Sequence, residues 1–437
     1  GEQMQFDVGL SYYGGGVRMN EIAGWTGLSW TLDGEYQISR IVNDLPDEWY
    51  NTASSSYMSG AYRDKGYLYT AKQQLDHPNW TSPGFLGLES FDIHLLSNVA
   101  TMDKFIFDSE PDEFRFALPN GVSGSFYRDH RANPNDLNGW KVKSKSNLVL
   151  EITHELHVVE YNTNNLYEIE LDKWSGGSTC KIPTLFTKFI IGTPDGYRYV
   201  FGGVETALEV SRGILKFPNP SDPKIKTEAQ YTVNSWKLSK IIAPSGEEVN
   251  FAYSRDKIQF QRSKELINAV KQGTNQWSTP SLEVNASITY PVYLSVIETK
   301  KQKLIFKRSQ AIEKWYLALV DSGCNMSTLG PSANNNNFSF LVLRDDQQHC
   351  QYAYNYLWDS QNNFEGNLPN YNQQLDSVIL FDKLSNQYVD GFKLVQRANP
   401  NHRRTLDRIF KFNFTDSKIQ DNYEFTYNNI EGLPNLE

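Results

Sequence analysis

Residues 188–202 read KFIIGTPDGYRYVFG and contain the pattern that decides the fold. Phe189 and Ile191 alternate with other residues before a central turn, and aromatic residues alternate in the same way after it. In the turn, Pro194 presets the first backbone dihedral and Gly196 accepts a positive φ. The stretch therefore predicts an antiparallel β-hairpin.

The same order of strand, glycine turn and strand recurs along the chain. Residues 113–129 repeat it around Gly121, and residues 235–254 repeat it around Gly246. Weaker units of the same kind begin at Tyr290, Leu375 and Arg408. Their spacing is unequal, which counts against a strict solenoid or a propeller with equal blades.

These units predict a mainly β fold, an extended antiparallel sheet of hairpins with a few short helices. Residues 90–101 and 309–319 are the helix candidates, because their apolar residues follow a helical period. We expect residues 1–437 to form one continuous β-rich scaffold fragment. Its tentative sub-regions are an opening segment (1–130), central hairpins (131–260) and C-terminal hairpins (261–437).

Composition narrows the class of protein. The 437 residues include 14% aromatics, which favours strands, and the net charge of −9 argues against a nucleic-acid partner. No apolar run approaches the roughly 20 residues that a membrane-spanning helix needs. The first residues already read as a strand, so we expect the chain to be cut from a longer protein.

The cysteines are Cys180, Cys324 and Cys350, without a CxxC pair or a metal-ligand spacing. Cys324 and Cys350 could form a disulfide bond in an oxidising compartment, and three separate buried thiols are the alternative. The sequence does not decide between them.

Two histidines superficially resemble a zinc site. His154 and His157 lie in HELH, but a zinc-protease helix needs its histidines four residues apart, and here the spacing is three. The surrounding residues alternate as a strand, which would send the two side chains to opposite faces. We therefore assign no metal ligand.

An acidic run is the other candidate for chemistry. Asp108, Glu110, Asp112 and Glu113 could bind calcium or supply an acid/base pair, and a polar loop before a hairpin is the alternative. The glycine run 14–16 lacks the lysine and helix that a phosphate loop requires. We assign no catalytic, cofactor-binding or metal residue and expect the chain not to be an enzyme.

The opening of the chain carries a resemblance to a known family. Residues 8–48 read VGLSYYGGGVRMNEIAGWTGLSWTLDGEYQISRIVNDLPDE, with a serine-tyrosine strand, a glycine run, a glycine-tryptophan motif and an Ile-Ser-Arg strand. This order resembles the opening motif of SpvB-type and Tc-toxin B-component proteins, and more closely the N-terminal region of Bacteroidota Rhs/YD-repeat proteins. Companion motifs follow in the same order at 66–69, 108–112, 193–202 and 235–246.

The resemblance spans most of residues 7–300, and no YD repeat proper or C-terminal toxin module lies within the chain. One departure is Ser29, where the family often has glycine. Serine costs little there unless the position needs a positive φ. Physically, we expect Trp25 and Trp30 to plug a sheet interior. Arg40 can satisfy loop carbonyls or a carboxylate of Asp47 or Glu48.

The resemblance implies sheets that coil into a hollow shell around a C-terminal effector, or that display it at the cell surface. It implies a secreted or surface location in a bacterium. The implied partners are the rest of the same polypeptide or its effector module, with other secretion or surface proteins as further candidates. Because exposed Tyr and Trp can stack on sugars, a carbohydrate-binding or adhesin module is the alternative.

Overall fold

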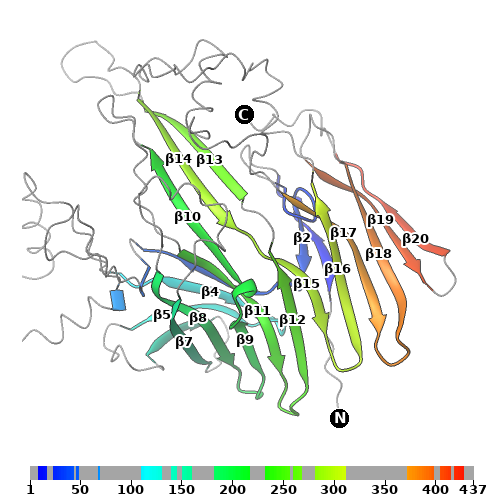
Figure 1. Cartoon of the computed structure of the whole chain (residues 1–437), viewed down its shortest axis with the longest axis horizontal. Helices are drawn as coiled ribbons and strands as arrows, with labels where there is room; N and C mark the ends of the chain where they lie inside the picture. Colours follow the sequence, from blue (N-terminus) through cyan, green and yellow to red (C-terminus); the bar gives the residue numbers. More distant parts are fainter. Residues whose placement is uncertain are drawn as a thin grey trace, which may run out of the picture. The chain divides into compact units, whose positions relative to one another are not determined.

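The structure is a computed structural model of the 437-residue chain, shown in Figure 1. It describes residues 8–16, 23–43, 46–48, 67–68, 110–129, 139–144, 150–159, 182–216, 232–255, 259–267, 281–311, 372–397, 404–414 and 418–427.

The fold is mainly β and antiparallel, as the hairpin pattern predicts. The first strands are β1 (Gly9–Tyr12), β2 (Trp30–Asp33), β3 (Gln37–Ile41), β4 (Glu113–Ala117), β5 (Ser123–Arg128), β6 (Trp140–Ser144), β7 (Glu151–Val159), β8 (Ile182–Gly192), β9 (Arg198–Gly202) and β10 (Leu208–Lys216). They are followed by β11 (Thr232–Ile242), β12 (Glu248–Ser254), β13 (Gln259–Ile267), β14 (Ser281–Tyr290), β15 (Tyr293–Glu298), β16 (Gln302–Gln310), β17 (Gln373–Asp382), β18 (Gln387–Arg397), β19 (Thr405–Asn413) and β20 (Lys418–Glu424). A short 3-10 helix, η2 (Glu205–Ala207), follows β9.

Each predicted hairpin is present. The pairs are β4–β5, β8–β9, β11–β12, β15–β16, β17–β18 and β19–β20. The turn glycines Gly121, Gly196 and Gly246 have φ values of 83°, 85° and 83°. These positive values explain why the three turns carry glycine.

One helix prediction is wrong at its start. Ser309 and Gln310 belong to β16, where they pair with β17, so a helix does not begin at 309. Pairing along the whole of β16 decides this, because a neighbouring strand outweighs a weak local helical period. The candidate helix 90–101 and the rest of 309–319 lie almost wholly outside the described residues.

The chain divides into two compact units, each made of separate stretches of sequence. Unit 1 comprises Gly1–Phe6, Glu35–Glu209 and Thr232–Asn250, and unit 2 comprises Asp7–Gly34, Val210–Tyr231 and Phe251–Glu437. The tentative sub-regions that end at residues 130 and 260 stay a prediction.

The core of unit 1 is an aromatic cluster. Phe114 and Phe126 are opposite each other across β4 and β5 and stack with ring centroids 5.2 Å apart. The ring centroids of Trp236 on β11 and Phe189 on β8 lie 5.0 Å apart. The indole nitrogen of Trp236 donates to the Phe186 carbonyl oxygen at 2.6 Å. All five side chains are fully buried. Such rings bury a large area each, and edge-on contacts add about 0.5–1.5 kcal/mol per pair.

Unit 2 contains an antiparallel meander. Strands β15 to β20 pair in chain order, and Figure 1 shows β16 to β20 side by side. Strand β14 pairs with both β13 and β10, and β12 pairs with β15. Strands β1 and β2 pair with each other in a separate two-stranded sheet.

The residues Gly24–Trp30, which we name the opening motif, pack against this meander. Trp25 is buried between Tyr293 and Phe306, with ring centroids 5.6 and 6.4 Å away, so it plugs the sheet interior as predicted. Gly27 has a φ of 108°, and a Cβ atom there would lie 2.9 Å from the Leu406 nitrogen. Glycine is therefore required both by the backbone and by the neighbouring strand.

Trp30 is half-buried, so it fills the sheet interior less completely than Trp25 does. Its ring packs on Phe425 at 4.7 Å, and its indole nitrogen donates to the Tyr427 hydroxyl at 2.8 Å. Tyr427 in turn donates to the Leu406 carbonyl. Trp30 thus joins the start of the described chain to its end.

A buried guanidinium holds the opening motif in place. Arg404, only 1% exposed, donates to the carbonyls of Gly24 at 2.9 Å and Trp25 at 3.4 Å. It also donates to Gln396 Oε1 at 2.5 Å, while Gln396 Nε2 donates to the Trp25 carbonyl at 2.8 Å. Arginine suits this position because its planar fork can serve several carbonyls at once.

Ser29, one of the departures from the resembled pattern, has a φ of 61° and so lies in the left-handed region. A side chain with a Cβ costs roughly 1–2 kcal/mol in that conformation. The Ser29 hydroxyl is buried and has no hydrogen-bond partner among the described residues, so no contact of that hydroxyl offsets the strain.

Replacing Ser29 with glycine should therefore stabilise unit 2. We expect S29G to be more stable than S29A by about 1 kcal/mol, because both lose the hydroxyl and only glycine relieves the strained φ. Urea unfolding of the two variants measures this difference. Equal stability of S29G and S29A would show that the backbone at position 29 is not strained.

Candidate functional site

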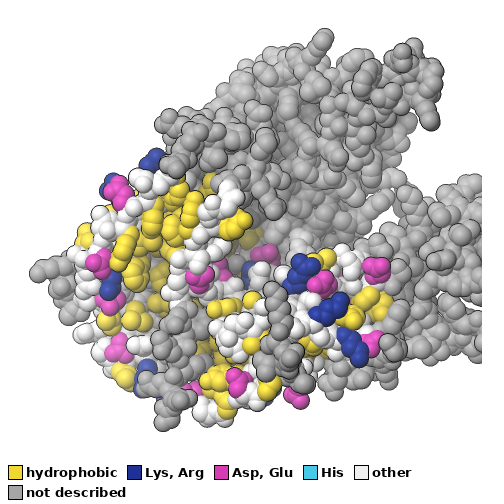
Figure 2. Space-filling view, turned by 180° about the vertical axis from the view of Figure 1, so that it is seen from behind, with side chains coloured by type: hydrophobic (Ala, Val, Ile, Leu, Met, Phe, Trp, Pro, Cys, Tyr) yellow, Lys and Arg dark blue, Asp and Glu magenta, His cyan; other side chains and the backbone are white. Residues whose placement is uncertain are grey.

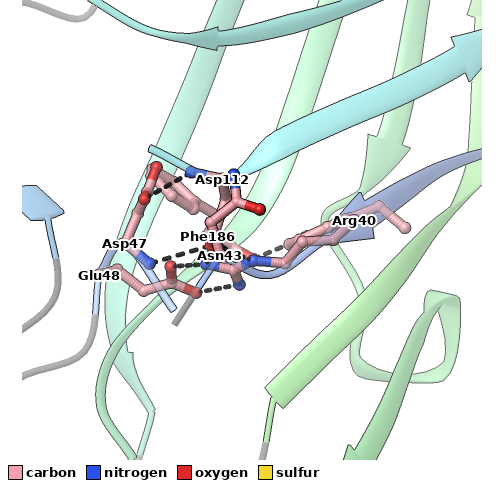
Figure 3. Close-up of polar contacts among 7 residues, drawn as sticks. Arg40, Asn43, Asp47, Glu48, Asp112 and Phe186 are labelled. Atoms are coloured by element: carbon pink, nitrogen blue, oxygen red, sulfur yellow. Dashed lines mark hydrogen bonds and ion pairs between the residues drawn. The ribbon is translucent and has the colours of Figure 1, made fainter. Parts of the chain in front are cut away.

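A buried group of charged residues surrounds Arg40 in unit 1, and we name Arg40, Asn43, Asp47, Glu48 and Asp112 the Arg40 cluster. Arg40 projects from β3, Asn43 follows that strand, and Asp112 immediately precedes β4. Pairing of β3 with β4 brings Arg40 opposite Phe114, two residues after Asp112. Asp47 and Glu48 come from the segment after β3, and Figure 3 shows them beside Arg40 and Asp112.

The guanidinium of Arg40 is shared between two carboxylates. Its Nε donates to Asp112 Oδ2 at 2.7 Å and its Nη1 to Glu48 Oε1 at 2.8 Å, while Nη2 forms ion pairs with both residues. Its carbon Cζ lies 5.3 Å from the ring centroid of Phe114 and 5.9 Å from that of Trp236. Aromatic faces attract a cation, so the core of unit 1 supports the same charge.

Asp112 collects donors from three parts of the chain. Its Oδ2 accepts from Arg40 and from the Asp47 backbone nitrogen at 3.0 Å, and its Oδ1 accepts from the Asn43 backbone nitrogen at 2.9 Å. In return, the Asp112 nitrogen donates to Asp47 Oδ1 at 2.9 Å. Several donors to one carboxylate favour its ionised form.

The cluster contains more acid than base. Asp47, Glu48 and Asp112 are 0%, 3% and 0% exposed, and Arg40 is the one cation among these residues. Burial and the Asp112 carboxylate raise the pKa of Asp47 well above its ordinary value. Burial also raises the pKa of Asp112, although Arg40 opposes that shift.

Arg40 itself stays charged. Burial opposes its positive charge, but Glu48 and Asp112 outweigh this effect and hold its pKa above the ordinary value. Asp112 accepts the larger set of donors, which favours its ionised form over that of Asp47.

Acids with perturbed pKa values are typical of active sites and also of buried ion-pair networks. A catalytic acid must reach its substrate, whereas every ionisable side chain of the Arg40 cluster is buried and bonded to its neighbours. The geometry therefore supports fastening of the chain rather than catalysis at this place.

The acidic run is divided by the fold. Glu110 is exposed, Asp112 is buried against Arg40, and Glu113 forms an exposed ion pair with Arg115 at 3.1 Å. Asp108 lies outside the described residues. Asp112 and Glu113 thus point to different cations, Arg40 and Arg115.

The HELH segment is a strand, as predicted. His154 lies in β7, accepts a hydrogen bond from Trp140 at 3.1 Å and packs edge-on against Phe186 at 5.1 Å. The side chain of His157 is outside the described residues. In the described part of the chain, no group of three His, Cys, Asp or Glu residues could hold a metal ion.

The other candidates give little further information. Cys180, Cys324 and Cys350 lie outside the described residues, so their pairing stays open. Gly16 of the glycine run has a φ of 99° and follows β1. No helix in the described ranges is both long and apolar enough to cross a membrane.

The prediction for Arg40 is confirmed for Glu48 but incomplete. Sequence reasoning missed Asp112 as the second partner of Arg40, and it missed Arg404 entirely. The only signal for Asp112 was an acidic residue directly before a strand, which also fits an ordinary polar loop. For Arg404 the sequence offers no signal, because its carbonyl partners carry no side-chain signature.

Comparison with known proteins adds structural neighbours only. No family model and no curated protein matches the sequence. A crystal structure of TcdB2-TccC3-TEV matches with 10% identity and a TM-score of 0.34, over 93% of this chain and 14% of that chain. The N-terminal domain of the effector protein SpvB from Salmonella typhimurium strain LT2 matches with 12% identity and a TM-score of 0.31, over 96% and 94%.

A Tc holotoxin pore structure from Photorhabdus luminescens also matches, with 12% identity and a TM-score of 0.26, over 72% of this chain and 16% of that chain. The structural neighbours are thus Tc toxins and SpvB, the proteins that the start of the chain resembles. This chain spans 14% of the TcdB2-TccC3-TEV chain. With TM-scores this low, the superpositions transfer neither a site nor an activity.

Removing the central cation tests the fastening role of the Arg40 cluster. Arg40→Met keeps an unbranched, mostly apolar side chain but leaves Glu48 and Asp112 buried without their counter-charge. Breaking a buried pair from one side costs about 3–5 kcal/mol. We expect unit 1 to lose that much stability in urea unfolding.

Arg115→Met is the matched control. Arg115 lies on β4 with its side chain 59% exposed, and its ion pair with Glu113 should contribute less than about 1 kcal/mol. If Arg40→Met unfolded at the same urea concentration as Arg115→Met, the Arg40 cluster would not fasten unit 1.

Proposed function

We propose that the chain is a structural β-sheet segment of a large secreted or surface protein of the Rhs family, and that it helps to encapsulate or display a C-terminal effector. The observation that carries this proposal is that residues of the segment resembling the family are buried and hold strands together. Trp25, Arg40 and Glu48 belong to the segment that resembles the family, and all three are buried in contacts that hold strands together.

Burial of these residues fits a scaffold better than an enzyme. A catalytic motif places reactive groups where substrate can reach them, whereas this one consists of an aromatic plug, a glycine against a strand and a buried ion pair. We therefore propose that the segment is not itself an enzyme. Strand edges on such a sheet must be paired or covered, which favours a larger assembly.

The finer parts of the proposal follow the sequence resemblance. They are membership of the Bacteroidota Rhs/YD-repeat proteins, a bacterial extracytoplasmic location, and coiling of the sheet into a shell. The proposed partners are the remainder of the same polypeptide or its effector module, together with other secretion or surface proteins. No nucleic-acid partner is proposed, in line with the net charge of −9.

Limited proteolysis of the full-length gene product tests the encapsulating role. We expect a C-terminal module to resist protease in the intact protein and to become sensitive in Arg40→Met, because loss of the buried ion pair loosens the wall. The readout is the rate at which the C-terminal fragment is degraded, followed by mass spectrometry.

Arg115→Met should leave that rate at the wild-type value. A full-length chain without YD-type repeats or a distinct C-terminal module would contradict the proposal. So would a C-terminal module that is equally sensitive in the wild type and in both variants.

A carbohydrate-binding or adhesin module is the second candidate, because several large aromatic side chains are exposed. Tyr12, Tyr13 and Tyr388 are 49%, 69% and 48% exposed. Figure 2 shows hydrophobic side chains gathered in broad areas on one face of the described part. Glycan-array binding that is lost in Tyr12→Ala or Tyr13→Ala would favour this function, and absence of binding would count against it.

A further inference from the structure

In unit 1 the Arg40 cluster joins the two ends of residues 48–112, a stretch of sequence that we name the excursion. Glu48 lies at one end of this excursion and Asp112 at the other, and Arg40 binds both. Within the excursion, the Leu68 nitrogen donates to the Asp47 carbonyl at 3.0 Å. The cluster therefore holds the beginning, the end and one inner point of residues 48–112 together.

Among the described residues, the charges that face Asp47 come from β3, from the adjoining residue and from the start of β4. Strand β3 contributes Arg40, the adjoining residue contributes Glu48, and the start of β4 contributes Asp112. Trp236 on β11, an uncharged ring, lies against Arg40, and Tyr67 beside Leu68 is 1% exposed. If every carboxyl group were ionised, three negative charges would share one guanidinium in a buried space.

One oxygen in the cluster is suited to carry the proton that relieves this excess. Asp47 Oδ1 accepts from the Asp112 nitrogen, whereas Asp47 Oδ2 is buried without a hydrogen-bond partner among the described residues. An ionised oxygen in that position would be desolvated and unpaired, which is strongly unfavourable. A protonated oxygen carries no charge, so it avoids the larger part of that penalty.

We propose that Asp47 is a proton-operated latch: protonated Asp47 keeps residues 46–48 and 67–68 fastened to the start of β4, and loss of its proton releases them. Two hydrogen bonds between Asp47 and Asp112 keep the latch closed, because the backbone N–H of each residue donates to the carboxyl group of the other. Ionised Asp47 would place a negative charge directly beside that of Asp112. The latch is a property of unit 1 and does not depend on the proposed function.

The sign of the pH dependence follows from the direction of the shift. The pKa of Asp47 is higher in the folded chain than in the unfolded chain, because burial and Asp112 disfavour its charge. The closed latch is therefore fully stable below the unfolded pKa and weakens as the pH rises through the folded pKa. Asp112 shifts in the same direction and adds to the effect.

Hydrogen exchange followed by mass spectrometry measures the opening. Protection factors, which correct for the intrinsic pH dependence of exchange, are compared from about pH 5 to about pH 9 for peptides that cover 46–48, 67–68 and 110–113. Between the unfolded and the folded pKa of Asp47, opening releases its proton, so protection should fall about tenfold per pH unit there, as expected for one linked proton.

In Asp47→Asn the protection of the same peptides should fall less steeply with pH, because the amide has the same shape and carries no charge while Asp112 still titrates. Glu113→Gln is the matched control. Glu113 is a partly exposed acid next to Asp112, and its variant should keep the wild-type slope.

Protection in β8 and β9 reports whether each variant is folded. A wild-type slope of zero would overturn the latch, even if Asp47→Asn failed to fold. An unchanged slope in folded Asp47→Asn would overturn it as well.

Discussion

Burial of one guanidinium among carboxylates is the constraint on which unit 1 depends. Arg40 sits against the aromatic core, where leaving a charge unpaired is far more costly than it would be in water. Asp112 and Glu48 must therefore stay beside it, and with them the start of β4 and the segment after β3.

Unit 2 uses a buried arginine in a different way. Arg404 has backbone carbonyls of the opening motif as its partners, together with the amide of Gln396, rather than an ion pair with that motif. Carbonyl groups of a tight loop cannot bond to one another, so a fork of donors satisfies them where no strand can. Each unit thus fastens an irregular segment to regular strands with one guanidinium, through carboxylates in unit 1 and carbonyls in unit 2.

The hairpins were predictable because their determinants are local. In residues 188–202, alternation sets the inward face and Pro194 with Gly196 sets the turn, so neighbouring residues suffice. The helix expected from Ser309 failed for the opposite reason. Its apolar period is local, but pairing of β16 with β17 comes from residues more than sixty positions away and overrides it.

By itself, the sequence determined the strands, their turns and the burial of Trp25, since alternation and glycine placement act over a few residues. Only the tertiary structure decided the partners of the two arginines. Arg40 and Asp112 are 72 residues apart, and Arg404 and Gly24 are 380 apart. An acidic residue before a strand looks the same whether it faces solvent or a buried cation, and a backbone carbonyl has no side-chain signature. Packing of distant segments distinguishes these cases, because only the folded chain removes water from the charge.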